Sequence, residues 1–297
     1  MSSASSDGAK VCFDGPPMRF SRPTKEQLSA LSGMERLAYS IGDLTSRHFT
    51  LGSAAYNSVV MSAMLWATAS RRLRVHGLEN LASFGKKDIV LVVANHRTFF
   101  DFFVVCAVTF WKTNMSRRIL FPVRSNFFYD HPLGPMINVA MSGMTMFPPL
   151  LRNGGIQRRA TFNEYSLQRS IEELKVPGTM MGLHPEGTRN KNEDPYTLLR
   201  ARSGVGRIAL ASPQAHIIPA FLLGMGNQLQ KEFRYNWLEA EHTQIDALFG
   251  PEVDLSDLRA EPPAKDTAQR ASQRMLDAIA ALAKQHKETI GLPKITG

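Results

Sequence analysis

From residue 75 onward, short apolar runs alternate with longer segments in which apolar side chains recur at helical spacing. The short runs predict strands near residues 75–76, 89–94, 119–122, 145–147, 179–183 and 217–223. The longer segments predict helices near residues 102–109, 133–141, 161–174, 204–211 and 267–286. This alternation predicts an α/β fold with a mixed central sheet flanked by helices. In such folds, functional residues gather where strands end and helices begin.

The first 74 residues have a different pattern. Residues 1–23 are small and polar with interspersed prolines, which predicts a disordered lead. Thr24, with Gln27 three positions later, predicts a helix start, and apolar residues follow at helical spacing as far as Ile41. A second helix is predicted over residues 54–73. We therefore expect three parts: the lead, an N-terminal helical pair over residues 24–74, and one α/β domain over residues 75–297.

Residues 49–70 contain no charged side chain, and a segment of this length can span a bilayer. Serine, threonine and asparagine residues interrupt it, so the pattern favours a helix that lies on a membrane or packs on the main domain. Arg71, Arg72 and Arg74 follow directly. Arginines beside an uncharged helix are typical of attachment to an anionic membrane surface. The alternative is that the apolar stripe packs on the α/β domain behind it.

The chain is basic. Its 297 residues include 35 lysines and arginines against 26 aspartates and glutamates, a formal net charge of +9. This charge favours anionic partners, but the arginines are scattered and no nucleic-acid-binding motif is present, so we expect anionic lipid and no nucleic acid. No cysteine and histidine cluster has metal-site spacing, and we expect no metal. Two cysteines, Cys12 and Cys106, and no secretory signal in residues 1–8 predict a cytoplasmic protein at the cytoplasmic face of a membrane.

Two polar signatures each follow a predicted strand. The first runs from Asn95 to Asp101 and reads N-H-R-T-F-F-D, and the second runs from His184 to Arg189 and reads H-P-E-G-T-R. In the first, a carboxylate five residues after His96 can reach back to one ring nitrogen, fix the tautomer and stabilise the imidazolium. The other nitrogen is then free to deprotonate a hydroxyl. The first signature therefore predicts a general base with an orienting carboxylate.

The second signature has the residue types of an anion site. Gly187 lets the backbone turn and approach a ligand closely. Arg189 can bind a phosphate or carboxylate with two hydrogen bonds, and Thr188 adds a hydroxyl. Glu186 beside an anion is costly unless it binds a substrate hydroxyl or orients the arginine. A surface turn with a local ion pair is the alternative interpretation.

Together and in this order, the signatures resemble those of the glycerolipid acyltransferase family, the lysophosphatidic-acid-acyltransferase-like group, with N-H-x4-D followed by E-G-T-R. The apolar run that ends in Pro219 and the basic, glycine-containing segment 202–206 resemble further family blocks, so the likeness covers about residues 75–255. The resemblance implies a glycerol-phosphate-acyltransferase-like fold and makes residues 75–297 an acyltransferase domain.

The resemblance also implies a reaction: a fatty acyl group passes from an acyl thioester, acyl-CoA or acyl carrier protein, to a hydroxyl of a lysophospholipid-like acceptor, with no cofactor. It implies that His96 is the general base and Asp101 its partner. It further implies acceptor or substrate contacts from residues of both signatures: Asn95, Arg97, Glu186, Gly187, Thr188 and Arg189.

One departure concerns the acceptor. The family's second block ends in an arginine, in a pattern like G-x-x-F-I-D-R, whereas this chain has Pro149 at that place. Arg124 or Arg152 can substitute for the missing arginine. Alternatively, the acceptor is a lipid-linked sugar, an amino-acid lipid or a hydroxylated secondary metabolite. A non-catalytic protein that binds anionic lipid is the alternative of a different class.

Overall fold

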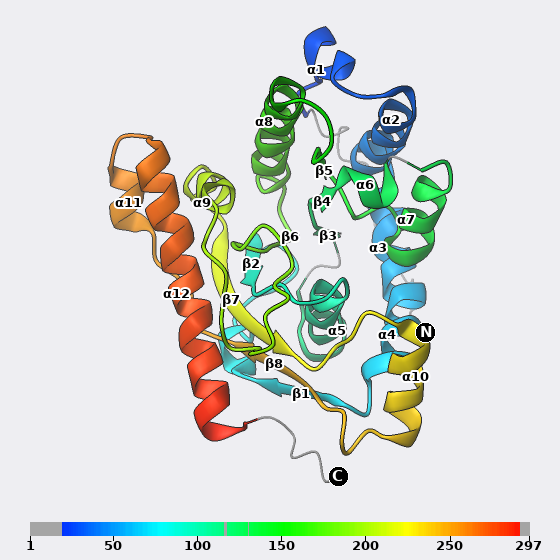
Figure 1. Ribbon diagram of the computed structural model, residues 1–297, viewed down its shortest axis with the longest axis vertical. Helices are drawn as coiled ribbons and strands as arrows, with labels where there is room; N and C mark the ends of the chain where they lie inside the picture. Colours follow the sequence, from blue (N-terminus) through cyan, green and yellow to red (C-terminus); the bar gives the residue numbers. More distant parts are fainter. Residues whose placement is uncertain (1–19, 116–117, 130, 292–297) are drawn as a thin grey trace, which may run out of the picture.

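The computed structural model describes residues 20–115, 118–129 and 131–291, and its centre is a six-stranded sheet in the order β1-β8-β7-β2-β6-β3 (Figure 1). All neighbouring strands are parallel except β7 and β8, which are antiparallel. The predicted mixed α/β sheet is therefore confirmed. The strands are β1 (Leu73–His76), β2 (Val90–Ala94), β3 (Arg118–Leu120), β6 (Thr179–Leu183), β7 (His216–Leu223) and β8 (Ile245–Phe249).

Alternate residues of the central strands point to opposite faces of the sheet, and both faces are apolar. In β2, Val90 and Val92 belong to one hydrophobic core, while Leu91 and Val93 belong to the other. A strand buried on both faces reads as a continuous apolar run, which is why its sequence was a clear signal.

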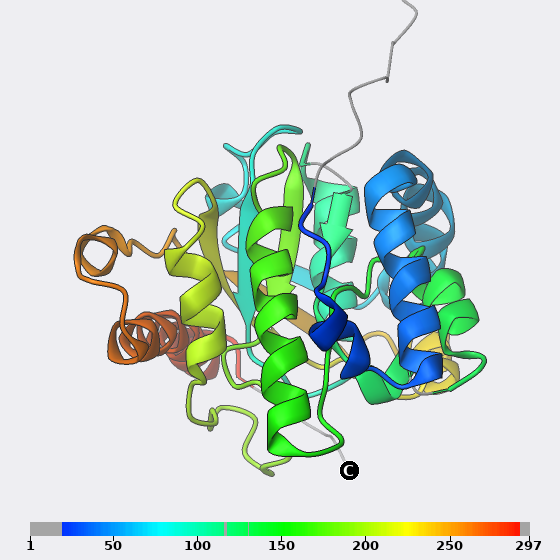
Figure 2. The same ribbon diagram turned by 90° about the horizontal axis from the view of Figure 1, so that it is seen from above.

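Helices cover both faces of the sheet (Figure 2). One core packs beneath α5 (Asp101–Lys112), which has Phe102 to Phe110 entirely buried. The other packs beneath α8 (Ile156–Glu173), α9 (Ser203–Leu210) and α12 (Lys265–Thr289), of which α12 contacts both α9 and β7. Further helices in the sheet-forming part of the chain are η2 (Leu78–Asn80), α6 (Ser125–Phe128), α10 (Leu229–Leu238) and α11 (Ser256–Ala260).

The N-terminal segment is helical but is divided differently from the prediction. Thr24 and Gln27 form the predicted capping box of α1 (Lys25–Ser29), but this helix stops, and Ser32 with Glu35 forms a second capping box that starts α2 (Gly33–His48). A continuous run follows: α3 (Thr50–Tyr56), the π-helix η1 (Asn57–Met61) and α4 (Ser62–Ala69). These helices pack on β3, α5, α7 (Gly134–Ser142) and α10. Within the described residues, no helix is both long and apolar enough to cross a bilayer.

Most of the predicted lead lies outside the described residues. Of its last four residues, Phe20 is buried, and its ring lies 4.0 Å from the guanidinium carbon of Arg169. The chain is therefore already packed on α8 before the first helix begins.

The strand predicted near residues 145–147 is wrong. Met144 has a positive φ of 64°, and the chain turns there instead of extending. The neighbouring strands are β4 (Val123–Arg124) and β5 (Pro149–Leu150), which form a separate parallel ladder with Val123 opposite Pro149 and Arg124 opposite Leu150. This small ladder lies beside the carboxyl ends of the main strands and brings residues 124 and 152 to one place.

Candidate active site

The two polar signatures meet at one end of the sheet. Val93 of β2 lies opposite Leu183 of β6, and because the strands are parallel, the chain leaves both at the same edge. His96 and His184 follow these strands, and their rings stack with centroids 4.0 Å apart and planes 7° apart. The Asn190 N–H donates to the His96 carbonyl at 2.6 Å. Segments 90 residues apart in the chain thus form one wall.

His96 is oriented by Asp101, the first residue of α5. The distance from His96 Nδ1 to Asp101 Oδ2 is 3.1 Å. The same carboxylate accepts hydrogen bonds from the N–H groups of Arg97 (2.6 Å) and Thr98 (2.8 Å) and from the Thr98 hydroxyl (2.7 Å). Burial raises the pKa of Asp101, but these donors favour its ionised form and oppose that rise. A carboxylate only accepts, so Nδ1 carries the ring proton and Nε2 has the free lone pair.

The His96 ring is held in its neutral form. Its side chain is 21% exposed. Burial, followed by the charges of Arg189 and Arg124, lowers the pKa of His96 to about 3. A neutral imidazole is the form that can accept a proton, and an anion bound to the two arginines would remove the charges that weaken it as a base.

A cavity of about 640 Å³ opens beside His96. One part of its wall is apolar, with Phe99, Phe102, Phe121, Met146, Leu150, Leu167, Leu183, Val205 and Ile208. The other part is basic, with Arg124, Arg152, Arg189 and Arg202. Among the described residues that line it, the only carboxylate is Glu186. An apolar arm joined to a basic end fits a molecule with a hydrocarbon chain and an anionic group.

The arginines meet at the turn of the second signature. Arg124 donates to the Thr188 hydroxyl at 2.5 Å, and the Arg152 guanidinium donates to the Gly187 carbonyl. Gly187 has a φ of 65°, in the region that favours glycine. Burial, with the neighbouring charges of Arg152 and Arg189, lowers the pKa of Arg124. Such mutual repulsion makes the cluster receptive to an anion.

A profile of the acyltransferase family matches residues 72–222, which contain both signatures and the strands from β1 into β7. The chain belongs to the acyltransferase family. No curated protein matches it. Membership identifies an enzyme that takes an acyl donor and a lipid acceptor as substrates. Within the described residues, no cluster of metal-ligating side chains is present.

Two residues of this acyltransferase that the sequence predicted to contact substrate are not among those that line the cavity. Asn95 is fully buried, and its amide pairs with the backbone of Leu222 in both directions, at 2.9 and 2.7 Å. Its role is therefore to join the end of β2 to β7. Arg97 is not among the residues that line the cavity, and its guanidinium donates to the carbonyl of Asn192 at 2.8 Å, so it holds the loop that follows the second signature.

Glu186 links the two signatures of the acyltransferase. It is 1% exposed, and its two carboxylate oxygens accept the N–H groups of His96 and Leu199, both at 2.8 Å. Both carboxylate oxygens of Glu186 are therefore occupied by backbone donors, one of which is the N–H of His96. These contacts also explain how a carboxylate can lie beside an anion site: it is buried, and backbone N–H groups satisfy both of its oxygens.

The sequence interpretation did not assign His184 or Arg202 to the site. His184 is oriented by a 2.9 Å contact between its Nδ1 and the Ala94 carbonyl, and burial lowers its pKa to about 3, with a further contribution from His96. Arg202 was visible only as part of a basic segment. Neither residue has a sequence spacing that places it in the cavity, because tertiary packing brings them there.

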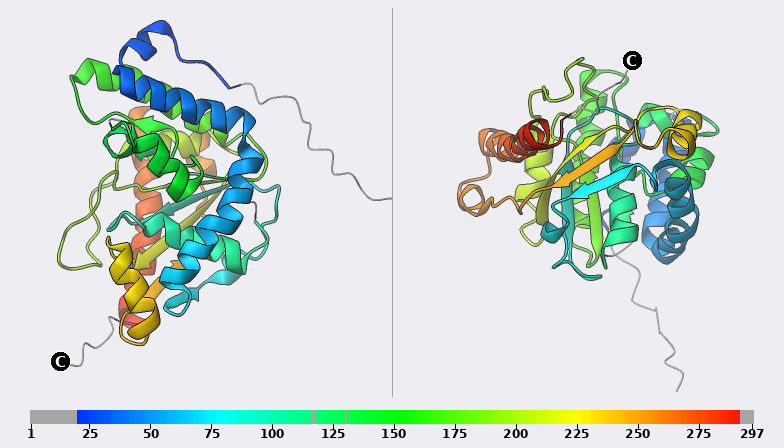
Figure 3. Two further views of the ribbon diagram at one scale, coloured as in Figure 1. Left: turned by 90° about the vertical axis from the view of Figure 1, so that its right-hand side faces the viewer. Right: turned by 90° about the horizontal axis from the view of Figure 1, so that it is seen from below.

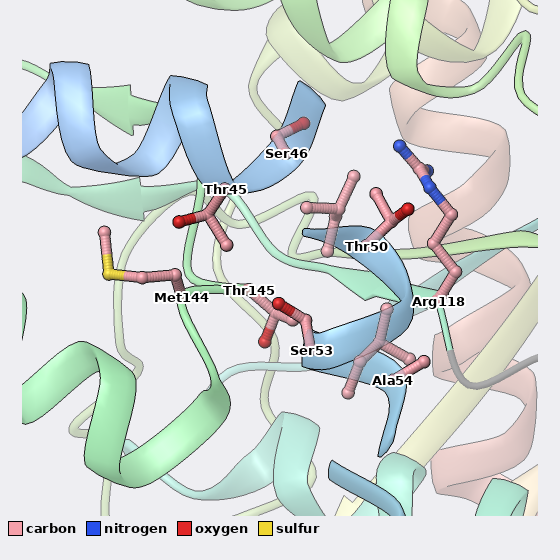
Figure 4. Close-up of a pocket in the computed structure, with 10 residues that line it drawn as sticks. Thr45, Ser46, Thr50, Ser53, Ala54, Arg118, Met144 and Thr145 are labelled. Atoms are coloured by element: carbon pink, nitrogen blue, oxygen red, sulfur yellow. The ribbon is translucent and has the colours of Figure 1, made fainter. Parts of the chain in front are cut away.

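A second cavity, of about 20 Å³, lies between α2, α3 and the segment around Thr145 (Figure 4). It has room for about one water molecule. Its lining contains Arg118 but no histidine, aspartate or glutamate. The described residues that line it therefore offer no imidazole or carboxylate to accept a proton.

Proposed function

We propose that the protein is an O-acyltransferase that moves a fatty acyl group from an acyl thioester to a hydroxyl of a lysophospholipid-like acceptor. The observation that carries the proposal is His96: Nδ1 is bonded to Asp101, and the ring lies in the wall of a cavity with an apolar arm and a basic end. Asp101 is a positioning residue in this scheme, and His96 is the general base.

The reaction follows from this geometry. The acceptor hydroxyl oxygen attacks the thioester carbonyl carbon while His96 Nε2 takes the hydroxyl proton. Asp101 stabilises the imidazolium that forms. The tetrahedral intermediate collapses, the carbon–sulfur bond breaks, and the sulfur leaves as a thiolate that takes the proton from His96. The products are an ester and a free thiol.

The basic end supports a phosphate-bearing acceptor. Pro149, which stands where related chains carry an arginine, lies in β5, and the β4–β5 ladder places Arg124 beside it. Arg124 reaches the turn at Gly187 and Thr188. These contacts favour an acceptor like lysophosphatidic acid over a lipid-linked sugar or an amino-acid lipid without a phosphate near the hydroxyl.

We further propose that the enzyme lies on an anionic membrane surface at the cytoplasmic face. Exposed apolar side chains gather on α2, α3, η1, α4, α7 and α10, which lie side by side on one face of the molecule (Figure 3). The most exposed are Leu37, Leu44, Phe49, Leu51, Val59, Trp66, Met136, Phe233 and Leu238. A face of this composition is typical of interaction with a lipid surface or another protein. Failure to co-sediment with anionic liposomes at low salt would contradict this proposal.

The test of the reaction is thiol release from palmitoyl-CoA, with and without lysophosphatidic acid, for the wild type, His96→Ala and His242→Ala. His242 is an exposed histidine outside the cavity and serves as the control. We expect acceptor-dependent release by the wild type and the control, and its loss in His96→Ala. Release that persists in His96→Ala would refute the assignment of the base. Lipid binding without release by any variant would favour the non-catalytic alternative.

A further inference from the structure

The four arginines of the cavity form an inner pair and an outer pair. Arg124 and Arg189 are half-buried and lie near enough to His96 for their charges to act on its ring. Arg152 and Arg202 are exposed at the mouth, and the charges that act on Arg152 are those of Arg202 and Arg159. The charge of Arg152 also acts on Arg124, and both guanidinium groups reach the Gly187 carbonyl, so the outer pair extends the positive charge of the inner pair from the base toward solvent.

The outer pair is a built feature of the mouth. The Arg152 guanidinium donates to the Gly187 carbonyl, while the stem of Arg202 packs on the other side, where a Cβ added to Gly187 would meet Arg202 Cγ at 3.1 Å. Arg202 is also the N-cap of α9, so the positive end of the helix dipole adds to its charge. In the described part of the chain, Arg152 and Arg202 form no ion pair with a carboxylate.

One phosphate beside the acceptor hydroxyl would bind only to the inner pair, Arg124 and Arg189, and would leave the outer pair without a ligand. A cavity of about 640 Å³ has the size that encloses one moderately large ligand. It cannot also enclose the carrier of a thioester, which has to extend through the mouth. The carrier group common to CoA and acyl carrier protein is phosphopantetheine, whose phosphate lies at the end remote from the sulfur.

We propose that Arg152 and Arg202 form a second phosphate subsite, which binds the phosphate of the donor's phosphopantetheine arm while Arg124 and Arg189 bind the acceptor. This assignment rests on the proposed acyl-transfer function, but the phosphate binding that it predicts can be measured without turnover. It makes the outer pair responsible for recognition of the donor and the inner pair for recognition of the acceptor.

The direct test is calorimetric titration of the full-length protein with 4′-phosphopantetheine and with pantetheine, which lacks the phosphate. We expect the wild type to bind phosphopantetheine about tenfold more tightly, since one charge-assisted hydrogen bond contributes roughly this factor. Arg202→Gln, which keeps the backbone of the α9 cap, should lose the difference. Arg200→Gln, an exposed arginine two residues away and outside the cavity lining, should retain it. Equal binding of both probes by the wild type, or an unchanged difference in Arg202→Gln, would overturn the proposal.

Kinetics then identify the source of the phosphate. With palmitoyl-CoA and lysophosphatidic acid, Arg202→Gln should raise the KM for palmitoyl-CoA about tenfold and leave the KM for the acceptor unchanged. With a palmitoyl thioester of N-acetylcysteamine, which has no phosphate, wild type and variant should be equal. A rise in the acceptor KM alone would assign the outer pair to the acceptor and refute the donor assignment. If no variant transfers acyl groups, the proposed function fails, and the titration still decides the subsite.

Discussion

Replacement of Asp101 by asparagine separates the charge of the orienting residue from its geometry. The Oδ2 atom accepts hydrogen bonds from the N–H groups of Arg97 and Thr98 as well as from His96. Because two fixed backbone donors point at this position, the asparagine should place its carbonyl oxygen there and its NH2 group at the Oδ1 position, where the Thr98 hydroxyl can rotate to accept. The ring tautomer should therefore be preserved.

What the substitution removes is the negative charge beside the imidazolium. The His96 Nδ1 to Asp101 Oδ2 distance is 3.1 Å. Opposite charges at about 4 Å in a partly buried site attract by about 4 kcal/mol. Loss of this attraction in the transition state corresponds to a fall in kcat of about 10³-fold. The KM values should change little, because Asp101 is not among the residues that line the cavity and binds no substrate in this scheme.

The assay is the thiol-release rate at saturating substrates for the wild type, Asp101→Asn and Asp257→Asn, an exposed aspartate in an ion pair with Arg274. Nitrogen-15 NMR of the His96 ring in Asp101→Asn should still show the proton on Nδ1. A fall in kcat of less than about tenfold, with the tautomer preserved, would refute the reasoning that the carboxylate charge stabilises the imidazolium.

Other predictions follow from the same contacts. Burial and nearby arginines lower the pKa of His96 to about 3, so kcat/KM should not fall near pH 6.5 on acidification but only as the pH approaches that lower value. The acid-side fall in kcat should begin at a higher pH than that in kcat/KM, since bound phosphate neutralises the arginines. Coincident profiles near 6.5 would contradict this. Thermal unfolding should show stability falling as the pH is lowered from about 6.5 toward 3. Over this range His96 and His184 bind protons in the unfolded chain but stay neutral in the folded state. His184→Phe should weaken this pH dependence of stability, and an unchanged dependence would argue against the buried neutral pair. Glu186→Gln keeps one acceptor but turns an NH2 group toward the N–H of His96 or Leu199, so kcat should fall roughly tenfold or more, with KM nearly constant; a pure KM effect would restore the acceptor-binding interpretation. Gly182→Ala places a Cβ 1.7 Å from the Phe102 ring, so calorimetry should show a loss of about 1–3 kcal/mol, and unchanged stability would mean that the ring moves freely into the cavity.

The elements that the sequence predicted well are those whose signal is local. β2 and β6 are continuous apolar runs because both faces of each strand are buried, and the polar signatures at their ends follow directly. The Thr24 capping box is also local, since its hydrogen bonds join residues three apart. β8 was not predicted because Asp246 interrupts a five-residue run; in the folded chain this carboxylate lies beside His76 and His286.

The side-chain roles depended on tertiary contacts and were less predictable. Asn95 and Glu186 have the residue types of substrate ligands, but bonds to the backbone of Leu222 and of His96, both far away in the chain, occupy them. Arg124 and Arg152 were candidates from their charge alone, and it is the β4–β5 ladder that brings them to one turn. The stacking of His184 on His96 depends on the register of β2 with β6, which no local pattern specifies.

The most direct test of the account is identification of the product by mass spectrometry after incubation of the full-length protein with palmitoyl-CoA and an equimolar mixture of lysophosphatidic acid and lysophosphatidylcholine. The account predicts palmitoyl ester on the hydroxyl of lysophosphatidic acid in preference to lysophosphatidylcholine, because the inner arginines favour the phosphate with the higher charge, and no product with His96→Ala. Palmitoyl transfer to neither lipid, or equal product from His96→Ala, would contradict it.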